Sequence, residues 1–233
     1  MVSISIITNI EDASRIVEHE NIIVVIDVLR ASSTITTALS NGALKVYVFR
    51  EINDAINCFK KVPNCILAGE RGGLKIEGFQ LGNSPREFSR DLVYGRYISF
   101  TSSNCAKMVE AFKNAKYLLL ACFLNISTVS SYLKYVSSKY GLNVVLACAG
   151  RYGAPSSEDS LCAEIIRDMV LGLLDKPPLN DFSNFLRLTS AGRHLNKLGM
   201  GSDVEYCGLV DLLNTIPFWD GEGFIQLQFK GGE

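Results

Sequence analysis

The stretch NIIVVIDVLRASSTITTALSNGA, residues 21–43, combines the pattern of a buried strand with a single acidic residue, whose role is the first question that the sequence raises. Apolar residues at 22–26 run directly into Asp27, Arg30 follows three positions later, and hydroxyl side chains crowd positions 32–37. A continuous β-branched run of this kind is typical of a strand covered on both faces of a sheet. A buried carboxylate is costly unless something binds it, so the segment predicts a strand that leads into a site.

The same pattern recurs along the chain. Apolar runs that we interpret as short buried strands lie at 22–26, 45–49, 65–69, 96–100, 116–122 and 143–149. Between them, apolar residues at helical spacing predict helices within 51–62, before Pro63, and within 125–141, where Gly141 suits a C-cap. Alternating strands and helices predict an α/β sandwich with a mixed, largely parallel sheet.

Three segments depart from this alternation. Residues 70–89 are Gly-rich and lack a helical period, which favours a long functional loop over an ordinary connection. Residues 173–182 have the composition of a linker, so a subdomain boundary is expected there if anywhere within a single domain over 1–233. The tail at 223–233 alternates apolar and polar residues, as an exposed antiparallel edge strand would.

Composition narrows the class of protein. With 48% hydrophobic residues the chain is globular, and with 23 basic against 24 acidic residues it carries no field that would attract nucleic acid or an acidic membrane. The seven cysteines follow no disulfide or CxxC spacing, which indicates reduced, buried thiols in a cytoplasmic protein. No export leader is recognisable, and no apolar run reaches the roughly 18 residues of a membrane helix.

Polar side chains gather where strands give way to helices. Clusters follow three of the predicted strands, at Asp27–Thr34, at Thr101–Asn104 and, after a glycine-containing loop, at 156–159. Ligands of open α/β sheets bind at the carboxyl ends of strands, and helix N-termini there suit phosphate. Such residues are also ordinary N-caps, and that alternative stays open for each cluster taken alone.

The acidic residues suggest a hard cation. The only histidines, His19 and His194, form no zinc-type motif, and for His194 packing on a helix is favoured over lining a site. The available oxygen ligands, which suit Mg²⁺, are Asp27, Glu70, Glu77, Glu158, Asp159, Asp203 and Asp211. The Glu158–Asp159 pair could instead complement a helix dipole, and Arg30 could either pair with Asp27 or hold a phosphate.

Three long motifs carry a resemblance to a known family. VVIDVLRASSTITTAL (24–39), LAGERGGLKIEGFQLGNSP (67–85) and CAGRYGAPSSEDSLCAE (148–164) together resemble the 2-phosphosulfolactate phosphatases, the ComB proteins of coenzyme M biosynthesis. HLNKLGMGSDVEYC (194–207) is similar to the C-terminal segment of the same family, so the resemblance spans nearly the whole chain. We therefore identify the chain as a member of that family.

The resemblance implies a three-layer α/β/α sandwich and a Mg²⁺-dependent phosphatase that converts 2-phospho-3-sulfolactate to 3-sulfolactate and phosphate. It implies catalytic roles for Asp27, Arg30, Glu70 and Arg71. The implied metal ligands are Asp27, Glu158 and Asp159. The implied substrate-binding residues are Ser32, Thr34, Asn83, Ser84, Thr101, Ser102, Asn104 and Gly150. The expected partner is a small phospho-sulfonate, with no nucleic acid or membrane; the oligomeric state, including a homo-oligomer, stays open.

One motif departs from the family pattern. The family usually has Thr-Thr-Asn-Gly-Thr where this chain has Ser102-Ser103-Asn104-Cys105-Ala106, which adds a side chain at Cys105 and removes a hydroxyl at Ala106. A phosphatase of another phosphorylated hydroxy acid is therefore a second hypothesis, and a non-catalytic anion-binding protein a third. In the first hypothesis Asp27 holds Mg²⁺, Arg30 and Arg71 clamp the phosphoryl and sulfonate oxygens, and a water oriented by a carboxylate attacks the phosphorus. Phosphorylation of Asp27 itself remains an alternative.

Overall fold

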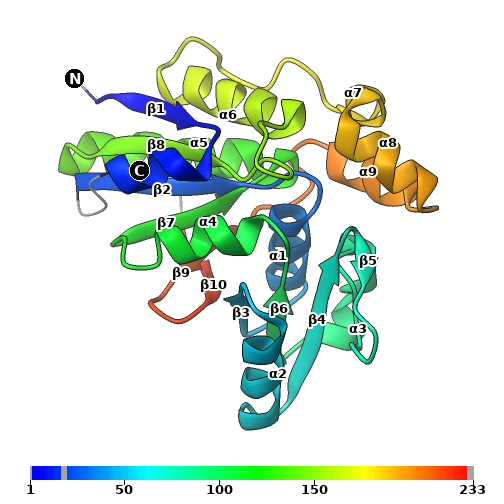
Figure 1. Cartoon of the computed structure of the whole chain (residues 1–233). Helices are drawn as coiled ribbons and strands as arrows, with labels where there is room; N and C mark the ends of the chain where they lie inside the picture. Colours follow the sequence, from blue (N-terminus) through cyan, green and yellow to red (C-terminus); the bar gives the residue numbers. More distant parts are fainter. Residues whose placement is uncertain (1, 17–19, 230–233) are drawn as a thin grey trace.

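The structure, a computed structural model, describes residues 2–16 and 20–229. It confirms the α/β class and the mixed, largely parallel sheet, with helices on both of its faces (Figure 1). Within the described residues, none of the helices combines the length and the apolar character that crossing a bilayer requires.

All six predicted strands are confirmed, to within one or two residues at either end. They are β2 (Asn21–Ile26), β3 (Lys45–Phe49), β4 (Cys65–Arg71), β6 (Tyr97–Thr101), β7 (Tyr117–Ala121) and β8 (Asn143–Cys148). The predicted helices are α2 (Ile52–Lys61) and α5 (Ile126–Tyr140), and Gly141 ends α5 in the left-handed conformation, as predicted. Short or polar elements were not predicted: β1 (Ile4–Ile7), η1 (Ile10–Arg15), β5 (Leu74–Lys75), η3 (Pro85–Glu87), α3 (Arg90–Val93) and η4 (Phe123–Asn125).

The sheet consists of two parallel halves joined by an antiparallel hairpin. Its described strands follow the order β1-β8-β2-β7-β9-β10-β3-β6-β4-β5, in which β9 (Ile216–Trp219) and β10 (Phe224–Leu227) form the hairpin. The prediction of an exposed edge strand at 223–233 is wrong, because β10 lies between β9 and β3 inside the sheet. Its alternating pattern is real, but β10 pairs with β3 only through Phe224 and Val46 among the described residues, so the polar positions stay accessible. Residues 230–233 lie outside the described part of the chain.

A buried helix covers the junction between the two halves. α1 (Ala31–Ser40) contacts β7 of one half, β3 of the other and both strands of the hairpin. Residues 31–39 are all buried, so this helix has no solvent face. Its hydroxyl side chains form hydrogen bonds within the helix: Thr36 Oγ1 donates to Ser32 O at 2.7 Å and Thr37 Oγ1 donates to Ser33 O at 2.8 Å. The hydroxyl cluster at 32–37 is therefore mainly the packing surface of a central helix.

Three apolar clusters make up the core. In β2, Ile22, Val24 and Ile26 face α5 and α6 (Ser157–Val170), whereas Ile23 and Val25 face α1 and α4 (Cys105–Ala111). A smaller cluster lies between β4 and α2. Both faces of the central strands are thus covered, which explains their continuous apolar sequences.

The chain after residue 170 packs on the same core. The segment 173–182 has no helix or strand, and α7 (Ser183–Leu188), α8 (Ser190–Lys197) and α9 (Gly201–Gly208) follow it. Each helix contributes buried side chains to the cluster around α5 and α6: Leu186 from α7, Leu195 from α8, and Val204 and Cys207 from α9. The three helices lie together beside the carboxyl end of β2 (Figure 1).

We predict that Phe224→Ala lowers the free energy of unfolding by about 3–5 kcal/mol, because its fully buried ring packs edge-on against Trp219 under α1. Gln226→Ala, at an exposed position of the same strand, is the control and is expected to change stability by less than ~0.5 kcal/mol. Urea denaturation followed by circular dichroism measures both. An equally small loss of stability in both variants would contradict the central position of β10 and would indicate a strand at the sheet edge.

Candidate active site

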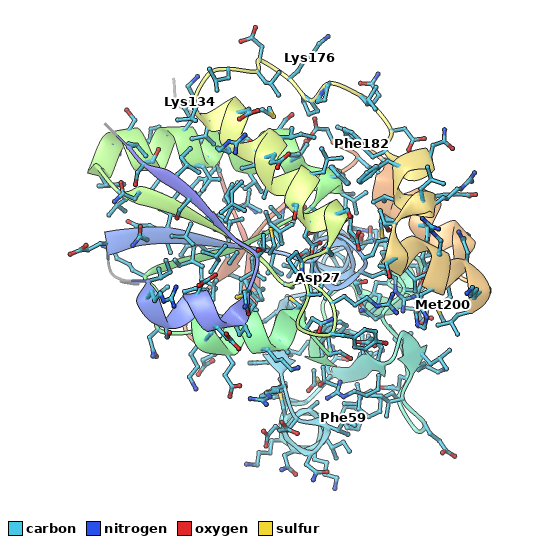
Figure 2. All side chains as sticks on the ribbon, turned by 45° about the horizontal axis from the view of Figure 1, so that its top comes forward. Asp27, Phe59, Lys134, Lys176, Phe182 and Met200 are labelled. Atoms are coloured by element: carbon cyan, nitrogen blue, oxygen red, sulfur yellow. The ribbon has the colours of Figure 1, made fainter. Side chains whose placement is uncertain are left out.

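Asp27 lies where β2 ends, near the middle of the molecule (Figure 2). Only 8% of the residue is exposed, and its Oδ1 accepts the Ala31 N–H at 3.3 Å. The turn is tightly held, because the Asp27 N–H donates to Ser32 Oγ at 3.0 Å and the Ser32 N–H donates to Asp27 O at 3.0 Å. The apolar strand therefore delivers one carboxylate to the base of a pocket at the carboxyl edge of the sheet.

Glu70, Glu158 and Asp159 also line this pocket. Glu70 comes from the end of β4 and Glu158 from the first turn of α6, and both are more than nine-tenths buried. Burial, with the negative charges of Glu70 and Glu158, raises the pKa of Asp27 to about 7. Burial also raises the pKa of Glu158, against the opposing charge of Arg151. Within the described chain none of the three forms an ion pair at 4 Å or less, so the pocket base carries excess negative charge.

Glu70 and Asp159 brace the loops around the pocket. Glu70 Oε1 accepts the Ser103 N–H and Oε2 the Gly73 N–H, both at 2.8 Å. Asp159 Oδ1 accepts the Val28 N–H at 2.8 Å, and its Oδ2 the Gly150 N–H at 3.1 Å. Because each oxygen of these two residues already receives a backbone hydrogen bond, Asp27 and Glu158 are the carboxylates better placed to face a ligand.

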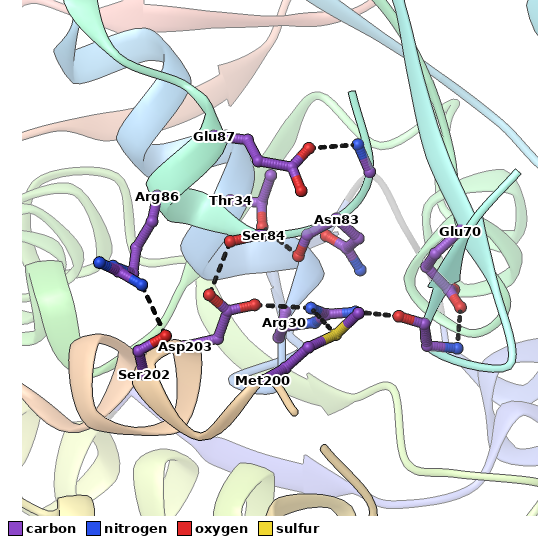
Figure 3. A network of polar contacts seen from close by, with 12 residues as sticks. Arg30, Thr34, Glu70, Asn83, Ser84, Arg86, Glu87, Met200, Ser202 and Asp203 are labelled. Carbon is purple, nitrogen blue, oxygen red and sulfur yellow. Dashed lines mark hydrogen bonds and ion pairs between the residues drawn. The ribbon is translucent and has the colours of Figure 1, made fainter. Parts of the chain in front are cut away.

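Arg30 is committed to a buried ion pair (Figure 3). Its Nη1 lies 2.6 Å from Asp203 Oδ2, and the two side chains are 2% and 4% exposed. Its Nη2 donates to Gly73 O at 2.6 Å, and Asp203 Oδ1 accepts from Ser84 Oγ at 2.6 Å. The partner of Arg30 is therefore Asp203 of α9, not Asp27, although Arg30 still lines the pocket.

Arg71 points elsewhere. Its Nη1 donates to Glu70 O at 2.7 Å, and its Nη2 donates to Arg50 O at 2.7 Å and to Thr101 Oγ1 at 3.0 Å. It is absent from the residues that line the pocket. These contacts tie the end of β4 to the ends of β3 and β6, so Arg71 supports the sheet edge behind the site.

The predicted residues thus divide into two sets. Those that line the pocket are Asp27, Arg30, Glu70, Asn83, Asn104, Gly150, Glu158 and Asp159. Those that lie behind it are Ser32, Thr34, Arg71, Ser84, Thr101 and Ser102, all of which hydrogen-bond to neighbouring loops or side chains. Thr34 is an example, since its Oγ1 donates to Asn83 O at 3.0 Å and so fixes Asn83 at the wall.

Among the described lining residues, Asn83 has a buried side-chain oxygen without a hydrogen-bond partner. It is 6% exposed, yet its Oδ1 has no hydrogen-bond partner within the described structure. Native proteins seldom leave a buried polar oxygen without a partner. An unsatisfied amide at the pocket wall is what a site completed by a ligand provides.

The pocket also contains residues that were not among the predicted site residues. They are Leu29, Gly72, Gly73, Ser103, Arg151, Tyr152, Ser156, Ala191, His194 and Leu195. The interpretation of His194 as a packing residue is wrong, because it lines the pocket and its Nε2 lies 2.9 Å from Gly72 O. Arg151 had a signal, since it directly follows Gly150 after a predicted strand, whereas nothing in the sequence indicates that α8 closes the site. His19 lies outside the described residues.

The Cys105 side chain does not line the pocket, although its backbone N–H hydrogen-bonds to the Asp27 carboxylate. Cys105 opens α4, is fully buried and packs in the cluster beneath α1. Burial, with the charges of Asp27 and Asp159, raises the pKa of its thiol well above the ordinary value, so it stays protonated. Ser103 and Asn104 line the pocket instead. The substitution therefore gives no support to an altered substrate.

The donor set suits Mg²⁺ by charge and chemistry. Asp27 and Glu158 offer carboxylate oxygens in a pocket whose negative charge a cation would offset. Across residues 2–16 and 20–229, three or more His, Cys, Asp or Glu side chains are nowhere gathered at metal-binding spacing. Mg²⁺ commonly takes only one or two carboxylates and completes its shell with waters and substrate phosphate, which is compatible with this arrangement.

Comparisons with known proteins agree on one family. The family model described as 2-phosphosulpholactate phosphatase matches residues 8–222. The chain is 36% identical over 214 residues to a protein of Caldanaerobacter subterraneus subsp. tengcongensis named probable 2-phosphosulfolactate phosphatase, covering 85% of this chain and 87% of that one. Proteins of the same name from Thermotoga maritima and Clostridium acetobutylicum are 36% and 32% identical, over 88% and 85% of this chain and 92% and 90% of theirs.

We predict that Asp203→Asn lowers the free energy of unfolding by about 3–5 kcal/mol, because it leaves the buried Arg30 charge without its counter-ion. Glu205→Gln is a matched control on the same helix, since Glu205 pairs with Arg187 on the exposed surface, where an ion pair contributes about 0–1 kcal/mol. Urea denaturation at neutral pH compares the two. Similar losses in both variants would contradict the role given to the buried pair.

Proposed function

Because this chain belongs to the 2-phosphosulfolactate phosphatase family, we propose that it is a phosphoric monoester hydrolase that converts 2-phospho-3-sulfolactate to 3-sulfolactate and phosphate. The observation that carries the proposal is the pocket in which Asp27, Glu70 and Glu158 meet the unsatisfied Asn83 at the carboxyl edge of the sheet. Several buried carboxylates would oppose a simple anion receptor, so this arrangement favours phosphoryl chemistry with a cation over the third hypothesis.

The proposal includes Mg²⁺, held by Asp27 and Glu158, with Asp159 as a further predicted ligand. When bound, the cation would offset the phosphoryl charge and lower the pKa of a bound water. In this proposal Asp159 keeps its second role, since its hydrogen bonds to Val28 and Gly150 hold the loops that carry the other ligands. Glu70 does the same for the loops at Gly73 and Ser103.

In the proposed reaction a water oxygen bonds to phosphorus, and the bond from phosphorus to the C2 oxygen of the substrate breaks. The water gives up a proton and the departing alkoxide takes one, so the pocket must both accept and donate protons. With Mg²⁺ bound, Asp27 and Glu158 would be ionised ligands, so their raised pKa values apply to the metal-free pocket. In this proposal the Asn83 Nδ2 group donates to substrate oxygens, whereas its unpartnered Oδ1 is an acceptor and would face a donor such as the attacking water. Attack by Asp27 itself remains the alternative, which trapping of a phosphoenzyme would reveal.

We also propose a metabolic pathway and a cellular compartment for the reaction. We place the protein in coenzyme M biosynthesis and in the cytoplasm, following the family. All seven cysteines are free thiols and six are buried, in keeping with a reducing compartment.

Phosphate release from purified protein tests the function, with 2-phospho-3-sulfolactate, 2-phospholactate and 3-phosphoglycerate compared in Mg²⁺ and in EDTA. We expect turnover that requires Mg²⁺ and prefers the sulfonate substrate. Equal turnover of all three would replace the proposal by a general phosphatase, and the absence of turnover would favour a binding protein.

Within this assay, Asp27→Asn is expected to lower kcat by about 10³-fold or more while the protein stays folded, since it removes the charge at the pocket base. Glu77→Gln is the control, because Glu77 is exposed in the 70–89 loop and does not line the pocket. Near wild-type turnover by Asp27→Asn would remove Asp27 from the catalytic machinery.

A further inference from the structure

A second, basic groove opens beside the pocket. It is lined by Arg151, Ser190, Arg193, His194 and Lys197, and we call it the α8 groove. The four α8 residues recur at helical spacing, three and four positions apart, so they share one face of the helix. The adjacent face carries Ala191 and Leu195 toward the pocket and the core. α8 therefore separates a buried apolar side from a cationic side at the pocket mouth.

The cations of the α8 groove have no close ion-pair partner within the described structure, although the charge of Arg151 is felt by Glu158. Arg151, Arg193 and Lys197 form no ion pair with a described carboxylate at 4 Å or less. Arg187, just before α8, is different, since it pairs with Glu205. A concave surface lined by charges of one sign concentrates counter-ions, so this groove attracts anions.

The groove and the pocket are continuous through two residues, Arg151 and His194, which line both. Arg151 is held by its loop, since its N–H donates to Ala154 O at 2.8 Å and its Nη1 donates to Ser190 O at 3.1 Å. The His194 ring is fixed by its contact with Gly72 O. The Arg151 guanidinium thus stands at a set position beside the acidic pocket base.

The two arginines expected to clamp the substrate are occupied elsewhere. Arg30 is paired with Asp203, and Arg71 is bonded to backbone oxygens and Thr101 outside the pocket. A substrate with a second strong anion still requires a cation, because a buried anion without one is costly. Arg151 is the arginine at the pocket that has no carboxylate partner at ion-pair distance in the described chain.

We propose that the α8 groove, with Arg151 at its inner end, binds the sulfonate of the substrate, which is one of its two non-reacting anionic groups, the other being the carboxylate. This inference rests on the proposed function and deepens it. The phosphoryl group then lies over the acidic pocket base, and the sulfonate points toward α8. The arrangement selects short phosphomonoesters that carry a further strong anion, and Arg151 is the residue that determines specificity.

Two substrates that differ only by the sulfonate test this site. We expect Arg151→Gln to lower kcat/KM for 2-phospho-3-sulfolactate by about 10- to 100-fold, mainly through KM, with much less effect on 2-phospholactate. Lys197→Gln, at an exposed position without a described ion pair, is expected to lower the same ratio less, by about 2- to 5-fold. Arg187→Gln removes an equal charge outside the groove and is the control. Equal losses on both substrates, or no loss in the first two variants, would overturn the proposal.

A binding measurement separates this inference from the proposed function. Calorimetry with 3-sulfolactate and with lactate needs no turnover. Arg151→Gln is expected to bind 3-sulfolactate about 10-fold or more weakly than the wild-type protein does. Lactate, which lacks the sulfonate, is expected to show no such change. If no phosphomonoester is hydrolysed but this difference is observed, the proposed function fails and the anion site stands. Turnover of phosphosulfolactate with unchanged 3-sulfolactate affinity in Arg151→Gln would leave the function and reject the site.

Discussion

The buried ion pair between Arg30 and Asp203 is the interaction on which the site depends. It joins the start of α1 to α9, and each partner recruits another loop: Arg30 through Gly73 O and Asp203 through Ser84 Oγ (Figure 3). Burying two charges costs free energy that the pair alone scarcely offsets, so its use is chiefly to fix one arrangement of these loops. α9 and the Gly-rich loop are thereby held against the end of β2.

This pairing also sets the charge of the pocket. Because Asp203 neutralises Arg30, the negative charges of Asp27, Glu70 and Glu158 remain without a side-chain ion pair among the described residues. The acidic base then favours a hard cation, and the neighbouring α8 groove favours an anion. A phosphomonoester with a second anion complements both surfaces, since its phosphoryl group can share the cation and its other end can reach the basic side.

The sequence predicted the elements that local pattern determines. Continuous apolar runs located six strands, and the strand-end rule brought Asp27 and Glu158 to one edge of the sheet. There they line one pocket with Glu70, which the family resemblance had implied. The sequence could not predict hydrogen-bond and ion-pair partners that depend on the tertiary fold. Asp203 is 173 residues from Arg30, and Arg71 turns away because backbone oxygens of neighbouring strands satisfy it. The strand near the C-terminus was wrongly predicted to lie at the sheet edge. Alternating apolar and polar residues indicate a half-exposed strand but do not indicate where it lies in the sheet.

The most direct test of this charge arrangement is calorimetric titration of Mg²⁺ into the metal-free protein at pH 6 and pH 8. Since the pKa of Asp27 is raised to about 7, the carboxyl is mostly protonated at pH 6 and the cation must displace that proton. We predict affinity about tenfold weaker at pH 6, proton release to the buffer at that pH, and loss of both effects in Asp27→Asn. Equal Mg²⁺ affinity in wild type and Asp27→Asn would contradict the assignment of a cation site at the end of β2.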